Sequence, residues 1–437
     1  MSDTVSGGPN HPIVVAPLAS RYFGLPAGVE LVEPGGASAG ATHPAGFLGS
    51  GVVAGLKDSG RPDVGVLAVA PAWRAQAASA AVFTTNAFAA APIVVNRSDC
   101  RLDHLLAVAV SSGNANACTG PQGLSVARAM QKACADGIGV RGDQVAVGST
   151  GIIGVSLDPA IVVAGVRAAS AALNPDGGPE FNRSIMTTDR FPKTCAFTVE
   201  TADGTVRLGV SGKGAGMISP AMATMICVVT TDAVVAAQDM QRMLGSAVDR
   251  SFNRITVDGE MSTNDMVLFL SSGASGVVLK GQSLRQFEQA LQAMLLRTAL
   301  MMVADGEGAT KIMRVQVVGA ETDAQAVSVA RAIADSPLVK TAMHGGDPNW
   351  GRIISSAGAA MAGRSLPGAI LELAGVRVVE GGAACAVSDA DRVRMTAGVR
   401  TPEVDIWLDL GLGQASAELF FADMGHEYIT INAEYHT

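Results

Sequence analysis

The chain alternates between short apolar runs and longer segments whose apolar residues recur every three or four positions. Eight runs are apolar or rich in β-branched residues and end at turn residues, which is typical of strands. They cover residues 64–69, 81–85, 105–110, 225–230, 266–270, 315–318, 406–410 and 428–431. The last of these precedes the C-terminus by only a few residues.

Three longer segments have the pattern of helices, at residues 159–173, 283–304 and 323–335. The first follows Asp158, a good N-cap residue, and has Pro159 at its first position. The second begins with Ser283 and, three residues later, Gln286, which is the pattern of a capping box. The third ends just before Pro337. Strands and helices are mixed throughout, which predicts a layered α/β or α+β fold.

Composition places the chain among packed globular proteins, since 48% of its residues are hydrophobic and 16% are charged. A length of 437 residues predicts two lobes or one large layered domain. The net charge of -8 and the absence of a basic run argue against nucleic acid or an acidic membrane as a partner. Residues 1–40 are rich in Gly and Pro and lack the features of a secretory or transit signal, so we expect a loosely ordered extension and a cytoplasmic protein.

The cysteines do not indicate a metal site. There are six, and no two of them have Cys-x-x-Cys spacing or a histidine cluster nearby. We therefore expect reduced, mostly buried thiols and no bound metal. The six are Cys100, Cys118, Cys134, Cys195, Cys227 and Cys385.

Several stretches are too polar or too rich in glycine to be plain core. Residues 113–120 combine Gly, Asn, Ala, Cys and Thr after a strand, and taken alone they favour an ordinary turn. Residues 148–154 lack the Gly-Lys-Ser/Thr ending of a P-loop, but a hydroxyl and a glycine N–H in a turn can stabilise an oxyanion. Residues 305–308, 346–352 and 431–437 are unusual loops that can equally be ordinary turns.

A further stretch, residues 213–225, places Thr224 after small residues and before an apolar strand. If the bond before Thr224 broke, its α-amine would titrate near about 7.7–8.0 and could accept the proton of its own hydroxyl. On this evidence alone, an ordinary β-branched strand residue is the better interpretation.

Taken together and in order, these stretches resemble the glutamate N-acetyltransferase/ornithine acetyltransferase family of arginine biosynthesis. The likeness runs from about Ala45 to Thr437. It also includes residues 82–86, 185–189, 251–258 and 262–265, which carry Val-Phe-Thr-Thr-Asn, Ile-Met-Thr-Thr-Asp, Ser-Phe-Asn-Arg-Ile-Thr-Val-Asp and Ser-Thr-Asn-Asp. The resemblance implies that family's fold, which is related to certain aminopeptidases, and a precursor that cleaves itself between Ala223 and Thr224.

The resemblance also implies roles for individual residues. Thr224 would be the nucleophile, and Thr150 and Gly151 the pair that stabilises the oxyanion. Residues matching substrate-contacting positions are Thr187, Lys213, Thr224, Glu307, Asn432 and Thr437. Acetyl would pass from N2-acetylornithine to glutamate with no metal or redox cofactor, and acetyl-CoA would be a candidate second acetyl donor.

The implied organisation is an extension over residues 1–40, an α fragment over 41–223 and a β fragment over 224–437, with two copies of each fragment forming a heterotetramer. Three alternatives stay open. One is an autoprocessed amidohydrolase or aminopeptidase in which water replaces glutamate. Another is an acetyltransferase of specialised metabolism, and the third is a non-catalytic relative that keeps only the fold.

Overall fold

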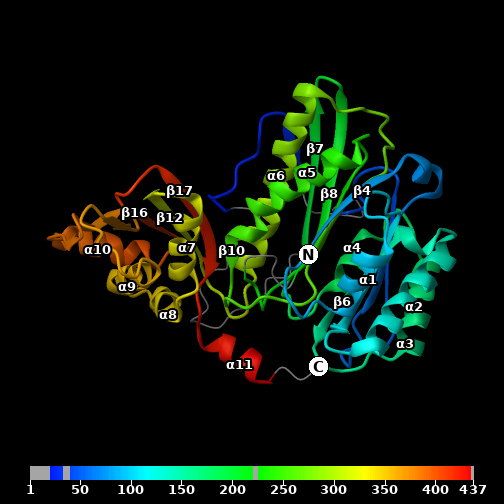
Figure 1. Ribbon diagram of the computed structural model, residues 1–437, viewed down its shortest axis with the longest axis horizontal. Helices are drawn as coiled ribbons and strands as arrows, with labels where there is room; N and C mark the ends of the chain where they lie inside the picture. Colours follow the sequence, from blue (N-terminus) through cyan, green and yellow to red (C-terminus); the bar gives the residue numbers. More distant parts are fainter. Residues whose placement is uncertain (1–19, 33–39, 220–224, 435–437) are drawn as a thin grey trace, which may run out of the picture. The chain divides into compact units, whose positions relative to one another are not determined.

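The computed structural model describes residues 20–32, 40–219 and 225–434 (Figure 1). The chain divides into two compact units. Of the described residues, the larger unit contains 23–32, 40–219, 225–253 and 260–302, and the smaller unit contains 20–22, 254–259 and 303–434. Each unit has its own β-sheet structure and its own apolar core.

The larger unit is built on two sheets. One has six strands in the order β1-β7-β8-β9-β11-β4, of which only the β9–β11 pair is parallel. The other has four strands in the order β2-β3-β5-β6, of which only β5–β6 is parallel. The strands are β1 (Val29–Leu31), β2 (Phe47–Val52), β3 (Val64–Val69), β4 (Ala78–Phe83), β5 (Ala107–Asn114), β6 (Val145–Ile152), β7 (Lys193–Thr201), β8 (Gly204–Lys213), β9 (Ile226–Thr231) and β11 (Met266–Ser271).

Alternating residues of the four-stranded sheet enter two different cores. In β5, Val108 and Val110 pack with Val228 and Leu268 of the six-stranded sheet. Ala107 and Ala109 point to the opposite face and pack against helices. This alternation is the period-2 pattern of a strand buried on both sides. The two sheets therefore face each other, and the helices cover the outside.

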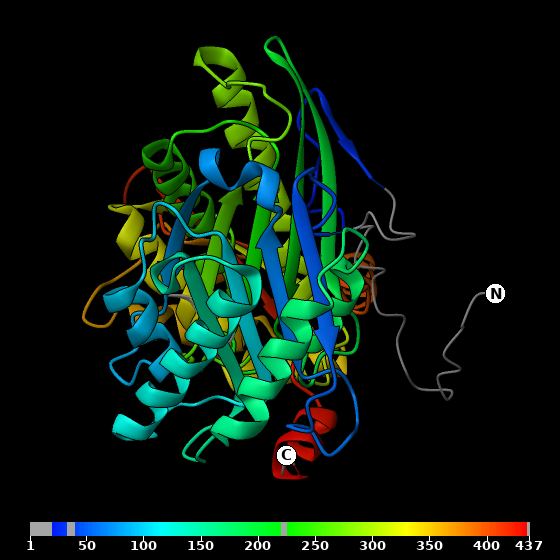
Figure 2. The ribbon, with the colours of Figure 1, turned by 90° about the vertical axis from the view of Figure 1, so that its right-hand side faces the viewer.

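Helices flank this sandwich on both outer faces. α1 (Ala91–Asp99), α2 (Gly120–Ile138) and α3 (Pro159–Ala171) cover the four-stranded sheet, and Figure 2 shows α2 and α3 in front of it. The other helices are α4 (Gly178–Ile185), α5 (Ala237–Asp249) and α6 (Gly281–Ala304), with short 3₁₀ turns η1 (Pro71–Gln76), η2 (Gly142–Gln144) and η3 (Phe252–Arg254). Phe287 of α6 stacks on Phe269 of the six-stranded sheet. Within the described ranges, none of the helices combines the length and apolar composition that a bilayer span requires.

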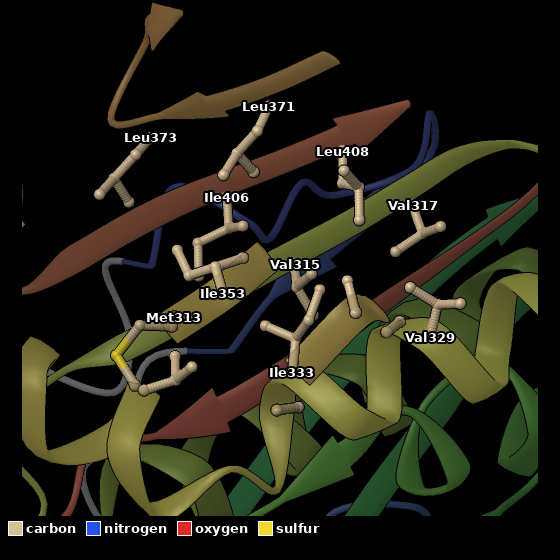
Figure 3. Close-up of a cluster of buried hydrophobic side chains, with 14 of the residues drawn as sticks. Met313, Val315, Val317, Val329, Ile333, Ile353, Leu371, Leu373, Ile406 and Leu408 are labelled. Atoms are coloured by element: carbon tan, nitrogen blue, oxygen red, sulfur yellow. The ribbon is translucent and has the colours of Figure 1, made fainter. Parts of the chain in front are cut away.

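The smaller unit is a seven-stranded mixed sheet in the order β10-β17-β12-β16-β13-β14-β15. Its strands are β10 (Ile255–Thr256), β12 (Ile312–Ala320), β13 (Ile370–Leu373), β14 (Val376–Glu380), β15 (Ala383–Ala384), β16 (Glu403–Asp409) and β17 (Ala415–Ala422); its helices are α7 (Asp323–Ala334), α8 (Pro337–Gly345), α9 (Trp350–Ala360), α10 (Asp389–Gly398) and α11 (His426–Glu434). Figure 3 shows Val315 and Ile406 of the sheet packed with Ile333 of α7 and Ile353 of α9. This apolar cluster is the core of the unit.

Most of the predicted elements are confirmed. Strand β3 has the predicted limits, and β4, β5, β9, β11, β12 and β16 overlap their predicted ranges. Helix α3 begins at Pro159, and the Asp158 side chain accepts hydrogen bonds from the N–H groups of Ala160 and Ile161, as an N-cap residue should. The six cysteines are free thiols, although only Cys134, Cys195 and Cys227 are buried. The layered α/β architecture is confirmed.

Four expectations about local structure are wrong. Residues 428–431 are part of helix α11, in which Asn432 Nδ2 donates to the carbonyl of Tyr428 one turn earlier. Helix α6 starts at Gly281, so Ser283 lies inside the helix and is not its N-cap. Residues 148–152 belong to β6 rather than to a turn. The N-terminal extension is not loose throughout, because β1 pairs with β7.

Candidate active site

Thr150 and Gly151 lie at the end of β6, where the parallel pairing with β5 becomes irregular. Thr150 is buried, with 2% of its surface exposed. Gly151 has φ = +135°, and a Cβ there would lie 2.3 Å from the carbonyl carbon of Gly113. Only glycine fits this conformation and this close approach of two backbones. The sequence therefore fixes the geometry beside the Thr150 hydroxyl.

The glycine- and asparagine-rich stretch at residues 113–120 packs against this strand end. Its backbone bonds to β6, with the N–H of Ala115 donating to the carbonyl of Ile152 at 2.9 Å. Asn116 and Cys118 both have positive φ angles, of 48° and 55°, which L-residues adopt rarely. Two stretches that the sequence singled out separately thus form one structure.

Lys213, the last residue of β8, reaches Thr150 from the six-stranded sheet. Its Nζ donates to Thr150 Oγ1 at 3.4 Å, and only 2% of the residue is exposed. Because the threonine oxygen accepts this bond, its own hydrogen remains a donor for another acceptor. A cation beside that oxygen also polarises the O–H bond, which suits a hydroxyl that stabilises negative charge.

Asp189 is the buried anion of the site. It forms a buried ion pair with Lys193, and its carboxylate accepts from the N–H groups of Gly214 at 2.7 Å and Thr187 at 2.9 Å. Burial opposes ionisation, but Lys193 and Lys213 together hold the pKa of Asp189 well below its usual range. Asp189 therefore stays charged and balances lysines that would otherwise be buried without a counter-ion.

Lys57 adds a third lysine near this cluster. Its Nζ donates to the carbonyls of Pro62 at 2.9 Å and Met186 at 2.7 Å. Burial and the charge of Lys213 lower the pKa of Lys57 to about 8, against the opposing effect of Asp63. The site thus contains an amine that changes charge close to neutral pH.

The predicted nucleophile Thr224 lies outside the described residues, as do Ala223 and Thr437. The chain is described again from Met225, which is buried and immediately precedes β9. The N–H of Met225, the group to which the Thr224 carbonyl is bonded, donates to Asp265 Oδ1 at 2.9 Å. The backbone of the residue that follows Thr224 is therefore held in place by the Asp265 side chain.

Glu307 and Asn432 lie in the smaller unit and contact each other there, with Asn432 Nδ2 donating to Glu307 Oε2 at 2.8 Å. Glu307 is 8% exposed and sits on a loop that touches α11. Gly308 has φ = +71°, and a Cβ there would meet the backbone N of Tyr428 at 2.6 Å. The loop therefore depends on this glycine for its contact with the helix that carries Asn432.

Within the larger unit the structure brings four predicted site residues together: Thr150, Gly151, Lys213 and Thr187. Thr187 is linked to the others by Asp189, which accepts from the N–H groups of Thr187 and of Gly214, the residue after Lys213. Sequence reasoning named none of Lys57, Asp189 or Lys193 as a site residue. Lysines at the ends of apolar strands were an available signal, because a lysine in such a position is rarely buried without a carboxylate partner.

Gly151 gives a test of this geometry. We expect Gly151→Ala to destabilise the larger unit by about 2–4 kcal/mol, since it combines positive-φ strain with backbone overlap. Gly154→Ala is the matched control, because Gly154 has φ = +85° but open space around its Cβ position, so about 1 kcal/mol is expected. Urea unfolding of both variants measures the difference, and equal losses would show that the close approach of Gly113 to Gly151 is unimportant.

Asp189 gives a second test. Asp189→Asn leaves buried lysines without their anion, and removing one partner of a buried pair typically costs about 3–5 kcal/mol. Since the folded pKa of Asp189 is lowered, its contribution is present above the unfolded value of about 3.9 and is lost as the pH falls below it. The variant should therefore lose stability at neutral pH and show a weaker acid dependence below about pH 4. Asp239→Asn, which removes an exposed partner of Arg242, should change little.

Known proteins are similar to this chain over most of its length. A family model described as the ArgJ family matches residues 49–437. The arginine biosynthesis bifunctional protein ArgJ of Symbiobacterium thermophilum is 43% identical over 404 residues, covering 91% of this chain and 98% of that protein. The protein of the same name from Nitratidesulfovibrio vulgaris is 42% identical over 393 residues, covering 90% and 98%. A solved ornithine acetyltransferase from Mycobacterium tuberculosis, in complex with ornithine, is 33% identical and covers 45% of this chain and 100% of its own, with a TM-score of 0.39.

The α/β fold and the family match define an enzyme whose curated relatives are named as bifunctional proteins of arginine biosynthesis. The chain belongs to the ArgJ family, whose model spans most of its length. The resemblance that the sequence motifs predicted is therefore confirmed.

Proposed function

We propose that this enzyme moves an acetyl group from N2-acetylornithine to glutamate through an acetyl-enzyme formed on Thr224. The observation that best supports this is the buried contact of Lys213 Nζ with Thr150 Oγ1, next to Gly151. It joins, inside one compact unit, an activated hydroxyl donor and the glycine that the family pattern pairs with it. Such a pair suits an acyl transfer, because a tetrahedral oxyanion needs fixed donors.

The reaction divides into two acyl transfers. The Thr224 hydroxyl attacks the acetyl carbonyl of N2-acetylornithine while the Thr224 α-amine takes its proton. The C–N bond breaks, ornithine leaves with a proton, and acetyl-Thr224 remains. The amine of glutamate then attacks this ester, which releases N-acetylglutamate and restores the hydroxyl. Thr150 and Gly151 stabilise the oxyanion in both steps.

The charged residues are proposed to bind the substrates. Lys213 would attract a substrate carboxylate, in addition to polarising Thr150. Glu307, with Asn432 beside it, would attract the cationic amine of ornithine, since a carboxylate and an ammonium form a strong charge-assisted hydrogen bond. Thr187, whose N–H is held by Asp189, and Thr437 complete the proposed substrate contacts.

The nucleophile is proposed to be freed by self-cleavage between Ala223 and Thr224. Strand β8 precedes this bond, β9 follows it, and the two are antiparallel neighbours in the six-stranded sheet. Cleavage would leave β9 between β8 of the first fragment and β11 of its own fragment. The buried hydrogen-bond ladder between β8 and β9 supports the proposal that residues 41–223 and 224–437 stay associated after cleavage.

We further propose a cytoplasmic enzyme that works as a heterotetramer of two such fragment pairs. The two transfers require no metal or redox cofactor, because the chain itself supplies the nucleophile, the base and the oxyanion donors. Acetyl-CoA is a candidate second acetyl donor to Thr224, and N-acetylglutamate formation from acetyl-CoA and glutamate is the assay that checks it.

The proposal is tested by supplying N2-acetylornithine with and without glutamate. We expect ornithine release beyond the first turnover only when glutamate is present, together with an equal amount of N-acetylglutamate. Steady ornithine release without glutamate would instead support the amidohydrolase alternative, in which water accepts the acetyl group.

A further inference from the structure

Residues 262–265 lie at a junction of the larger unit that the proposed chemistry does not use. This segment immediately precedes β11 of the six-stranded sheet, yet its side chains and backbone also contact the four-stranded sheet and its loops. Asn264 and Asp265 are both buried, at 4% and 0% exposed. Three of their four polar side-chain atoms make internal hydrogen bonds, whereas Asp265 Oδ2 has no partner among the described residues.

Asn264 holds the part of the site that carries the oxyanion pair. Its Nδ2 donates to the carbonyl of Ser149 at 2.8 Å and to that of Ala115 at 2.6 Å. Its Oδ1 accepts from the Thr263 hydroxyl, so both amide hydrogens and one lone pair of the amide oxygen are used. Because both Nδ2 partners are carbonyl oxygens, only a donor fits there. The Ser149 carbonyl belongs to the peptide that leads into Thr150.

Asp265 binds the backbone of Met225, which immediately precedes β9. Its Oδ1 accepts from the N–H of Met225, and the next residue, Met266, donates its N–H to the carbonyl of Met225 at 3.1 Å. Met225 is therefore fixed on both of its backbone polar groups, directly after Thr224 in the chain. The carbonyl of Asp265 also accepts from the N–H of Thr84 at 3.0 Å, which ties the segment to the end of β4.

The two contacts lie on adjacent residues but reach different sheets. Asn264 fixes β6 of the four-stranded sheet, and Asp265 fixes the approach to β9 of the six-stranded sheet. The regular pairing of β5 with β6 ends with Ser112–Thr150 and Gly113–Gly151, and the register shifts at Asn114. Thr150 and Gly151 are thus the last regularly paired residues of the ladder, and Asn264 bonds to the peptide carbonyl just before them.

We propose that Asn264 and Asp265 are positioning residues, which together align the Thr150–Gly151 donor pair with the chain end that carries Thr224. The inference rests on the proposed acetyl transfer through Thr224 and deepens it. The amide of Asn264 acts through its two donors, and Asp265 acts as a hydrogen-bond acceptor.

The pKa of Asp265 is consistent with its role as a hydrogen-bond acceptor for Met225. Burial raises the pKa of Asp265 well above its usual range, and this outweighs the opposing effect of the Met225 N–H and the other polar neighbours. A neutral carboxyl still accepts from Met225 through one oxygen. An asparagine at this position offers the same acceptor in the same shape.

The test compares isosteric variants in the acetyl transfer assay. Asn264→Asp keeps the shape but replaces two donors with acceptors that face two carbonyl oxygens. We expect kcat to fall about 100-fold, as a small misplacement of reacting groups can cause, with KM values changed less than about threefold. At lower pH the ratio of the variant's kcat to that of the unmodified enzyme should partly recover, because the protonated aspartic acid regains one O–H donor.

Asn96→Asp is the matched control. Asn96 is also fully buried, and its side chain also bonds to the backbone of β6. It does so at Val147, which lies three residues before Thr150. It should lose stability to a similar extent, measured by urea unfolding, while kcat stays within about twofold of the unmodified enzyme. If Asn264→Asp does not fold, Asn264→Ala is measured with the same expectation for kcat.

Asp265→Asn should keep a kcat close to that of the unmodified enzyme, whereas Asp265→Ala should fall as Asn264→Asp does. Equal kcat losses in Asn264→Asp and Asn96→Asp would overturn the inference, and so would an Asp265→Asn variant as impaired as Asp265→Ala. Failure of the unmodified enzyme to transfer acetyl to glutamate would instead reject the proposed function, so the two failures are distinguishable.

Discussion

Replacing Thr224 with alanine is expected to abolish both chain cleavage and acetyl transfer. Alanine has no hydroxyl to attack the Ala223 carbonyl, and it offers no oxygen on which an acetyl group can be carried. On a denaturing gel the variant should run as one band near the full 44.3 kDa, whereas the unmodified protein should give two fragments. Acetyl transfer should fall to background.

Thr224→Ser is the matched control, because it retains the hydroxyl and should retain cleavage and measurable transfer. Continued processing of Thr224→Ala would show that the cut lies elsewhere. A single full-length band for the unmodified protein would reject the self-cleaving enzyme altogether and would favour a non-catalytic member of the family.

Replacing Thr150 with valine is expected to lower kcat by about 10²–10³, which corresponds to about 2.7–4 kcal/mol for one oxyanion donor. Valine has nearly the same shape and the site is buried, so the loss should come from the missing hydroxyl. The KM values for N2-acetylornithine and glutamate should change little, because the oxyanion forms only in the transition state.

Thr150→Ser serves as its control, since it keeps both the acceptor for Lys213 and the O–H donor, and it should retain most of the kcat. A Thr150→Val variant with raised KM and unchanged kcat would show instead that Thr150 binds the ground state of the substrate. Steady-state kinetics of the two half-reactions decides between these outcomes.

The sequence predicted local features well where one strong pattern determined them. Strand β3 is buried on both faces and consists almost entirely of apolar residues, so its limits could be read from the chain. Helix α3 was found from its N-cap and its proline. In contrast, residues 428–431 have the composition of a strand but lie in helix α11, where they are mostly exposed.

Contacts between distant parts of the chain could not be predicted in this way. Lys213 and Thr150 are 63 residues apart, and Asn264 and Ser149 are 115 apart. Each was a polar residue at the edge of an apolar run, and nothing in its local pattern names its partner. The family resemblance identified Thr150 and Lys213 as site residues, but the ion pair of Asp189 with Lys193 and the role of Asn264 emerged only from packing.

The central claim is that Thr224 carries the acetyl group between the two substrates. The most direct test is mass spectrometry of the fragment beginning at Thr224 after the enzyme is mixed with N2-acetylornithine alone, and again after glutamate is added. We predict one acetyl group on Thr224 in the first sample and its loss, with N-acetylglutamate formed, in the second. A fragment that stays unmodified while N-acetylglutamate accumulates in the complete reaction would contradict the account, because the acetyl group would then pass directly between substrates.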